Sequence, residues 1–289
     1  MRIIQNHDEV KVTTMAHITE LQWLEMRNKR QTIKKLNKEE YVIMATGEMK
    51  EFQTKSETRA DNINSLGKTM RRLRNLIRAN FSGGQNELML TLTYAENMTD
   101  EKRLLDDLKK FYKKLKYHHG SFEYLTVIEP QGRGAWHAHI LVKFPAPIVL
   151  DNNSKTWKYW GHGFTRTKRL VEVDDIGAYL TAYLTDIPLE DARKLPVGTI
   201  SGEIVEKVHA DGKTKKYVKG GRVSLYPANM RIYRPSEGII KPESELMTYE
   251  NAKKKHSLEE ATFRSEHSFK LDDEKNQTVI YEQYNSKRK

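Results

Sequence analysis

Trp136-His137-Ala138-His139-Ile140-Leu141-Val142 is the stretch that decides how this chain folds. It predicts a β-strand, in which successive side chains point to opposite faces. His137 and His139 therefore share a face, roughly 6.5–7 Å apart along the backbone. The other face is apolar throughout and anchors the strand on a core; it comprises Trp136, Ala138, Ile140, Val142 and Phe144. Two imidazoles at that spacing can reach one metal ion, a common role of histidine.

The residues before this strand predict its partner. Residues 122–129 are typical of a strand and residues 132–134 of a turn, so 122–144 is expected to form a hairpin. Glu129 ends the partner strand, eight residues before His137. If the two faces match, two imidazoles and one carboxylate form a site with open positions that suits Mn²⁺ or Mg²⁺. The alternatives are a strand-end glutamate in solvent and histidines that are ordinary packed strand residues.

A short helix is expected at 176–186, after the capping residues Asp174 and Asp175. Tyr179 and Tyr183 are four residues apart and therefore share one face of this helix. Taken alone, the pattern is that of an amphipathic helix with aromatic core residues. A helix packed on the sheet would bring the tyrosine hydroxyls toward the histidines. There a phenolate can attack a phosphodiester that a divalent metal ion polarises.

The composition favours a polyanionic partner. The 289 residues include 50 Lys+Arg against 39 Asp+Glu, a net charge of +11. Nucleic acid is the first expectation and an anionic membrane surface the second. The absence of cysteine excludes disulfides, thiol catalysis and Cys-ligated zinc. No apolar run approaches the roughly 18–20 residues of a membrane span, and the N-terminus lacks a secretory pattern. We therefore expect a soluble, cytoplasmic protein with no membrane partner.

Two basic segments are candidates for DNA contacts. The helix expected at 58–80 has an apolar stripe on one face, and the basic residues of 63–80 crowd the others. These residues would contact phosphates or form a solvated helix face. The second candidate is residues 203–218, where two short runs flank Asp211-Gly212, a strong hairpin signal.

Two short sequences mimic the end of a nucleotide-binding phosphate loop. Both Gly67-Lys68-Thr69 and Gly212-Lys213-Thr214 lack the glycine that such a loop requires five residues earlier. We therefore expect no ATPase or helicase domain, and strand unwinding would need a helicase from the host.

Three segments in order resemble a known family. Leu90-Thr91-Leu92-Thr93-Tyr94, then Glu129-Pro130 with His137-Ala138-His139, then Tyr179-Leu180-Thr181-Ala182-Tyr183 resemble the motifs of HUH endonucleases. The resemblance is to the two-tyrosine rolling-circle replication initiators of bacterial plasmids and phages, and it spans residues 90–186. Residues 160–164, 225–227 and 232–234 also resemble members from Gram-positive hosts.

The resemblance implies a role for each matching residue. His137 and His139 match the metal-binding pair, and Glu129 matches the residue that completes the site for Mn²⁺ or Mg²⁺. Tyr179 and Tyr183 match the nucleophile pair, with Tyr179 as the first choice. Family members often have a lysine three residues after the first tyrosine, where this chain has Ala182. A lysine that steadies the phosphate must therefore come from elsewhere or is absent.

The resemblance also implies an α+β fold, a central antiparallel sheet with helices packed on it. We expect a basic, mostly helical DNA-contacting region at 1–82, an HUH nuclease domain at 83–242 and a charged, partly disordered C-terminal tail at 243–289.

The implied activity is a nickase and strand transferase acting on origin DNA that is single-stranded at the nick site. It forms a 5′-phosphotyrosine and a free 3′-hydroxyl that primes a host DNA polymerase, in the cytoplasm of a bacterial cell. Rival interpretations are a conjugative relaxase or a transposase of the same superfamily, which size and the tyrosine pair disfavour. A further rival is a non-catalytic DNA- or RNA-binding regulator.

Overall fold

The computed structural model describes residues 2–26, 32–37, 39–52, 58–150, 155–171, 173–200, 202–208, 213–228, 230–270 and 276–288. The chain forms two compact units. The first combines Met1–Ser56 with Glu243–Lys289, and the second is Glu57–Pro242. Each unit has its own cluster of buried apolar side chains.

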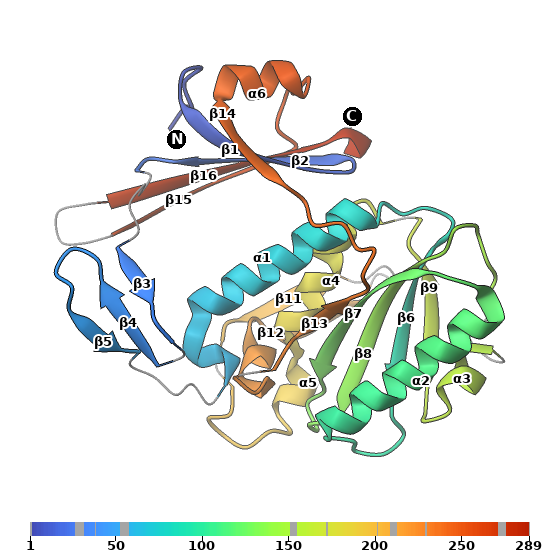
Figure 1. Cartoon of the computed structure of the whole chain (residues 1–289). Helices are drawn as coiled ribbons and strands as arrows, with labels where there is room; N and C mark the ends of the chain where they lie inside the picture. The colour runs from blue at the N-terminus through green and yellow to red at the C-terminus, as the bar shows by residue number, and fades with distance from the viewer. Residues whose placement is uncertain are drawn as a thin grey trace. The chain divides into compact units, whose positions relative to one another are not determined.

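The second unit is built on a five-stranded antiparallel sheet with helices on both faces (Figure 1). Its strand order is β13 (Tyr233–Pro235), β7 (Glu123–Pro130), β8 (Trp136–Lys143), β6 (Glu87–Thr93) and β9 (Thr165–Arg169). Helices α1 (Ile63–Asn80) and α4 (Ile176–Thr185) cover one face, and α2 (Glu101–His119) and α3 (Lys155–Trp160) cover the other. The expected antiparallel sheet with packed helices is therefore present in this unit.

The central hairpin forms as its sequence predicts. β7 and β8 pair antiparallel, with Glu129 opposite His137 and Val127 opposite His139. Residues directly opposite one another in a ladder lie on the same face, so Glu129 shares the face of both histidines. That face is the one covered by α1 and α4. The opposite face carries Ala138 and Ile140, which are buried beneath α2.

Helix α2 begins and ends where local chemistry directs. The Asp100 side chain accepts hydrogen bonds from the backbone N–H groups of Lys102 and Arg103 at the N-terminus. Gly120 ends the helix with a φ of 80°, a conformation that glycine adopts without steric strain. The buried residues recur at helical spacing and face the sheet: Leu104, Leu108, Phe111 and Leu115.

Helix α4 is held against α1. The Asp175 side chain caps α4 by accepting from the Ala178 N–H and pairs with Arg78 of α1 at 2.6 Å, with both side chains buried. A Cβ atom at Gly177 would lie 2.8 Å from the carbonyl oxygen of Arg74, closer than any real contact. The glycine therefore allows the two helix backbones to approach closely, and this approach fixes where α4 lies over the sheet.

A smaller three-stranded sheet follows α4. It orders β10 (Ile187–Pro188), β12 (Thr214–Val218) and β11 (Ile204–Val208), so the predicted hairpin of 203–218 is confirmed. Residues 209–212 of its turn lie outside the described residues. The short helices of this unit are α5 (Leu189–Ala192), η1 (Arg59–Asn62) and η2 (Gly221–Leu225).

The first unit is mostly strand. Its five-stranded sheet orders β14 (Ser244–Thr248), β1 (Glu9–Met15), β2 (Ile18–Leu24), β16 (Asn276–Asn285) and β15 (Phe263–Lys270). Helix α6 (Tyr249–Lys255) packs on one face of this sheet, over Val10, Val12 and Ile280. A separate three-stranded sheet contains β3 (Ile33–Lys35), β4 (Glu40–Ile43) and β5 (Met49–Glu51), and η3 (Ser286–Arg288) follows β16.

Two predictions about the ends of the chain are wrong. The region expected to be mostly helical at 1–82 contains five strands before α1. In β1, buried Val10 and Val12 alternate with exposed Glu9 and Lys11, which is strand periodicity. The boundary expected at residue 82 also differs, because α1 belongs to the second unit.

The expected C-terminal tail at 243–289 is folded in its described part. It supplies β14, α6, β15 and β16 to the sheet of the first unit, and β16 lies between β2 and β15. Pairing with a strand near the other end of the sequence leaves no local signal, which is why the charge-mixed composition was misleading.

Two smaller expectations need correction. Residues 156–173 were expected to be strand, yet α3 occupies the first part and β9 the second. Residues 226–242, expected to be loop, contain the short strand β13, which extends the central sheet. Among the described residues, no helix is both long and apolar enough to cross a membrane.

Candidate functional site

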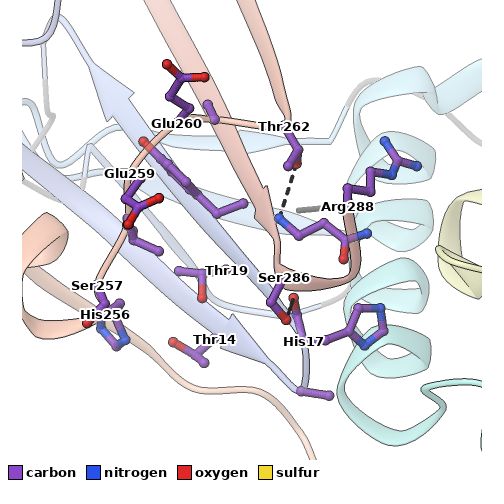
Figure 2. A pocket seen from close by; sticks show the side chains of 15 residues that line it. Thr14, His17, Thr19, His256, Ser257, Glu259, Glu260, Thr262, Ser286 and Arg288 are labelled. Atoms are coloured by element: carbon purple, nitrogen blue, oxygen red, sulfur yellow. Dashed lines mark hydrogen bonds between the residues drawn. The ribbon is translucent and has the colours of Figure 1, made fainter.

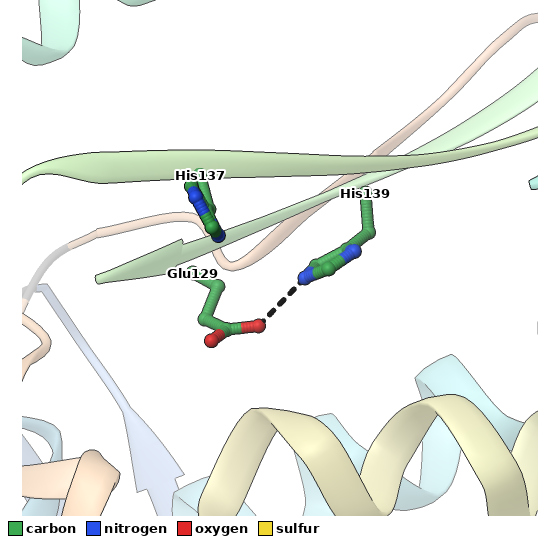
Figure 3. Close-up of side chains that lie close together, drawn as sticks. All are labelled: Glu129, His137 and His139. Atoms are coloured by element: carbon green, nitrogen blue, oxygen red, sulfur yellow. Dashed lines mark hydrogen bonds and ion pairs between the residues drawn. The ribbon is translucent and has the colours of Figure 1, made fainter. Parts of the chain in front are cut away.

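The sequence-predicted metal ligands come together at one end of the central sheet. One ligand atom from each of Glu129, His137 and His139 lies within 4.8 Å of the others. The three side chains converge from adjacent strands, with α4 passing beside them (Figure 3). The two imidazole rings are perpendicular, with centroids 6.1 Å apart. Strand alternation and the register of β7 on β8 are sufficient to create this arrangement.

Hydrogen bonds orient each of the three side chains. The His139 Nε2 donates to Glu129 Oε2 at 2.7 Å, and the Thr91 hydroxyl lies 3.3 Å from His139 Nδ1. Gln131 Nε2 donates to His137 Nε2 at 2.7 Å. Such outer partners fix the orientation of imidazole and carboxylate ligands.

The protonation states suit a cation site. Burial lowers the pKa of His137 to about 4; the charge of Glu129 opposes this, and those of His139, Arg222 and Arg133 add to it. Its imidazole is therefore neutral at neutral pH and can offer a lone pair. Glu129 is buried, which opposes its ionisation, but the hydrogen bond from His139 and the charge of Arg222 hold its pKa below the ordinary value. Two imidazoles and a carboxylate are a donor set that fits a divalent ion.

The tyrosine of α4 reaches the same place. Tyr179 is half-buried and lines a pocket of about 290 Å³ together with Glu129, His137 and His139. The remaining residues of this pocket are Met89, Thr91, Thr93, Phe164, Arg166, Lys168 and Leu180. Tyr183 belongs to α4, but its side chain and that of Ala182 lie outside the described part of the structure. One of the two predicted nucleophiles is thus located beside the candidate metal ligands.

A lysine contacts Tyr179 from a different element than the family pattern suggests. Lys168 of β9 donates from Nζ to Tyr179 Oη at 3.2 Å, and its Nζ lies 4.7 Å from the centre of the tyrosine ring. Arg166 lines the same pocket two residues earlier on β9. The basic run of β9 was visible in the sequence, but nothing there related it to the tyrosine helix.

Arg222 is a second residue that sequence reasoning missed. It lies in η2, far from the predicted motifs, and its Nη1 is 2.7 Å from Glu129 Oε1. Both side chains are buried. A single arginine after a basic hairpin carries no local signal of such a contact.

Other candidates lie away from this pocket. His162 Nε2 is 3.5 Å from Asp107 of α2, which agrees with a structural role for this histidine. The predicted DNA-contacting segments expose Lys68, Arg71 and Arg72 on α1 and residues 213–216 on the hairpin, and their role stays a prediction.

A pocket of about 880 Å³ in the first unit contains none of the predicted site residues. It lies between the tip of the β1–β2 hairpin, residues 256–262 and the end of β16, where the Ser286 N–H donates to the His17 carbonyl (Figure 2).

Comparison with known proteins supports one part of the chain. No curated protein and no solved structure is significantly similar to it. One family model matches residues 87–187, about a third of the chain, from the start of β6 to just beyond α4. The match thus includes the candidate metal ligands, Lys168 and Tyr179. Residues 87–187 are similar to the replication-associated protein family of the ORF2 type.

Proposed function

We propose that this protein is a metal-dependent, site-specific single-strand DNA nickase and strand transferase that initiates rolling-circle replication. The observation that carries the proposal is the shared pocket: Tyr179 lines it together with Glu129, His137 and His139. A tyrosine beside a divalent cation site has few other uses than covalent attack on a phosphodiester. The similarity of residues 87–187 to replication-associated proteins supports the same activity.

Each residue has a defined part in the proposed reaction. Glu129, His137 and His139 would hold Mn²⁺ or Mg²⁺, which when bound polarises the scissile phosphate and stabilises its developing negative charge. The Tyr179 oxygen attacks phosphorus after its proton passes to solvent. The bond from phosphorus to the 3′-oxygen breaks, and that oxygen takes up a proton. The products are a 5′-phosphotyrosine and a free 3′-hydroxyl.

Lys168 supports this step from the other side of the pocket. Its ammonium group, 3.2 Å from Tyr179 Oη, stabilises negative charge on the attacking oxygen and on the phosphate that it approaches. Arg166 on the same strand adds a second cation for the DNA backbone. Both residues lie on the edge strand β9, so a single DNA strand can lie along this edge without displacing a neighbouring β-strand.

The ester bond retains the energy of the broken phosphodiester, so a 3′-hydroxyl can later attack the phosphotyrosine and rejoin the strand. In this proposal, Tyr183 serves as the second nucleophile, a role that rests on the sequence alone. The free 3′-hydroxyl primes a host DNA polymerase, and a host helicase separates the strands in the bacterial cytoplasm.

The chemistry would be the same in a conjugative relaxase or a transposase. The description of the matching family favours replication over both. A non-catalytic regulator is the remaining alternative, and the adduct experiment separates it from the enzyme.

The direct test is capture of the covalent intermediate. Single-stranded oligonucleotides that tile the DNA around the gene are incubated with the full chain and Mn²⁺, then separated under denaturing conditions. We expect one oligonucleotide to form an adduct that resists denaturation and disappears when the metal is chelated. Tyr179→Phe should reduce the adduct strongly, and Tyr179→Phe with Tyr183→Phe should abolish it.

The outcomes separate the alternatives. If the wild-type chain forms no adduct with any oligonucleotide in Mn²⁺ or Mg²⁺, yet binds DNA, the protein is a binding regulator and the proposal is wrong. An adduct that survives in the double variant would assign the nucleophile to another residue.

A further inference from the structure

Arg222 links the candidate metal site to the helix that carries Tyr179. Its guanidinium donates from Nη1 to Glu129 Oε1 and to the Pro130 carbonyl, both at 2.7 Å. Its Nε donates to the carbonyl of Asp186 at 3.1 Å. Glu129 and Pro130 end β7, whereas Asp186 is the residue that caps the C-terminus of α4. One buried side chain thus joins the two elements that the proposed reaction must hold in register.

The backbone around Arg222 is built to keep this position. Gly220, which precedes η2, has a φ of 71°, and its N–H donates to Asp186 Oδ1 at 2.9 Å. Lys207 of β11 donates to Asp186 Oδ2 at 2.6 Å. The end of α4 is therefore tied to both η2 and the small sheet. These residues, Lys207, Gly220 and Arg222, all lie beyond the segment that matches replication-associated proteins.

We propose that Arg222 is a positioning residue that makes Glu129 a one-oxygen ligand. The guanidinium occupies Oε1, which leaves only Oε2, the atom 2.7 Å from His139 Nε2, free to bind a cation. A carboxylate held in this way cannot chelate the ion with both oxygens, so coordination positions stay open for a DNA phosphate. This inference rests on the proposed function, because it assumes that the three residues bind a metal ion.

Two simpler roles for Arg222 make different predictions. If only its charge matters, Arg222→Lys behaves like the wild type. In that case Arg222→Gln binds Mn²⁺ more tightly, because a cation next to the site has been removed. If Arg222 is only structural, both variants lower thermal stability and leave the Mn²⁺ affinity unchanged. Lysine keeps the charge but cannot donate in the two directions of a planar guanidinium.

The experiment measures Mn²⁺ affinity by calorimetric titration of the full chain, with melting in a chelator as the check for folding. We expect Arg222→Lys and Arg222→Gln each to weaken Mn²⁺ binding by about 10-fold, the usual effect of losing an outer-shell partner. Arg234→Lys is the matched control. Arg234 also binds a carboxylate, Glu101 at 2.8 Å, and a backbone carbonyl, that of Arg231, but is not in the pocket. It should leave the affinity unchanged.

The results distinguish this inference from the proposed function. If the wild type binds Mn²⁺ and Arg222→Lys binds it equally well, the positioning role is wrong while the metal site stands. Tighter binding by Arg222→Gln overturns it in favour of a charge effect. If the wild type does not bind Mn²⁺, the metal site itself is wrong. Should Arg222→Lys fail to fold, Arg222→Gln still decides, because it keeps a hydrogen-bond donor near Glu129.

Discussion

Lys168 Nζ lies 3.2 Å from Tyr179 Oη, although the two residues belong to different elements, β9 and α4. The similar initiators often have a lysine three residues after the first tyrosine, on the same helix, where this chain has Ala182. The contact from β9 delivers an ammonium group to the tyrosine hydroxyl by another route. It accounts for how the pocket can work without a lysine at position 182.

The first prediction concerns this contact. Lys168→Ala should slow formation of the DNA adduct by about 100-fold, because it removes one donor that stabilises transition-state charge. Single-turnover kinetics with a labelled oligonucleotide measure this rate, and equilibrium binding of the same oligonucleotide should change far less. Arg169→Ala is the matched control. It removes a cation from the same strand, but Arg169 donates to the Gln85 and Ile148 carbonyls and does not line the pocket. Equal losses in both variants would show that only the charge of the strand matters.

The second prediction concerns the metal ligands. His137→Ala should abolish metal-dependent adduct formation and Mn²⁺ binding, because it removes a direct ligand rather than an outer partner. Binding of duplex DNA, measured by fluorescence anisotropy, should persist. His162→Ala, which removes an imidazole on the opposite side of the sheet next to Asp107, should retain Mn²⁺ binding. Loss of duplex binding together with cleavage in His137→Ala would instead indicate a structural histidine.

The third prediction is a pH dependence of stability. Burial opposes ionisation of Asp175, but the hydrogen bond and charge of Arg78 and the Ala178 N–H hold its pKa below the ordinary 3.8. The carboxylate therefore binds its proton less readily in the folded state than in the unfolded state. Its contribution is complete above the ordinary pKa and is lost as the pH falls through the lowered one.

Asp175→Asn tests this dependence. At pH 7 the variant should unfold with about 3 kcal/mol less free energy, because it leaves Arg78 buried without its partner. The difference from the wild type should shrink as the pH falls below the ordinary aspartate pKa. Urea denaturation at a series of pH values measures both effects. A difference that is constant down to acidic pH would show that the cap, rather than the charge pair, carries the stability.

The fourth prediction compares two glycines. Gly177→Ala should destabilise the second unit by about 1–3 kcal/mol, because the added Cβ meets the Arg74 carbonyl at 2.8 Å. Gly67→Ala in α1 should stabilise it by about 0.5–1 kcal/mol, because nothing lies within 4 Å of that Cβ and alanine favours helix. Urea unfolding midpoints of the two variants check the pair. Equal effects would contradict the close approach of α1 and α4.

Much of the site could be predicted because its signals are local. Alternation within 136–142 determines that His137 and His139 share a face, and the turn at 132–134 determines that Glu129 lies on the neighbouring strand. The capping aspartate and the following apolar residues determine the helix that carries Tyr179. These features depend on neighbours within a few residues, whose geometry the backbone repeats of strand and helix dictate.

Only the tertiary structure decided the contacts between elements distant in the sequence. Lys168 meets Tyr179 because α4 packs on the face of the sheet toward which β9 directs that lysine, and Arg222 reaches Glu129 from η2, outside any motif. For the same reason the C-terminal segment was misjudged, since β16 is stabilised by pairing with β2 and β15 rather than by its own composition. Periodicity records which face a side chain occupies; it does not record which distant element that face will meet.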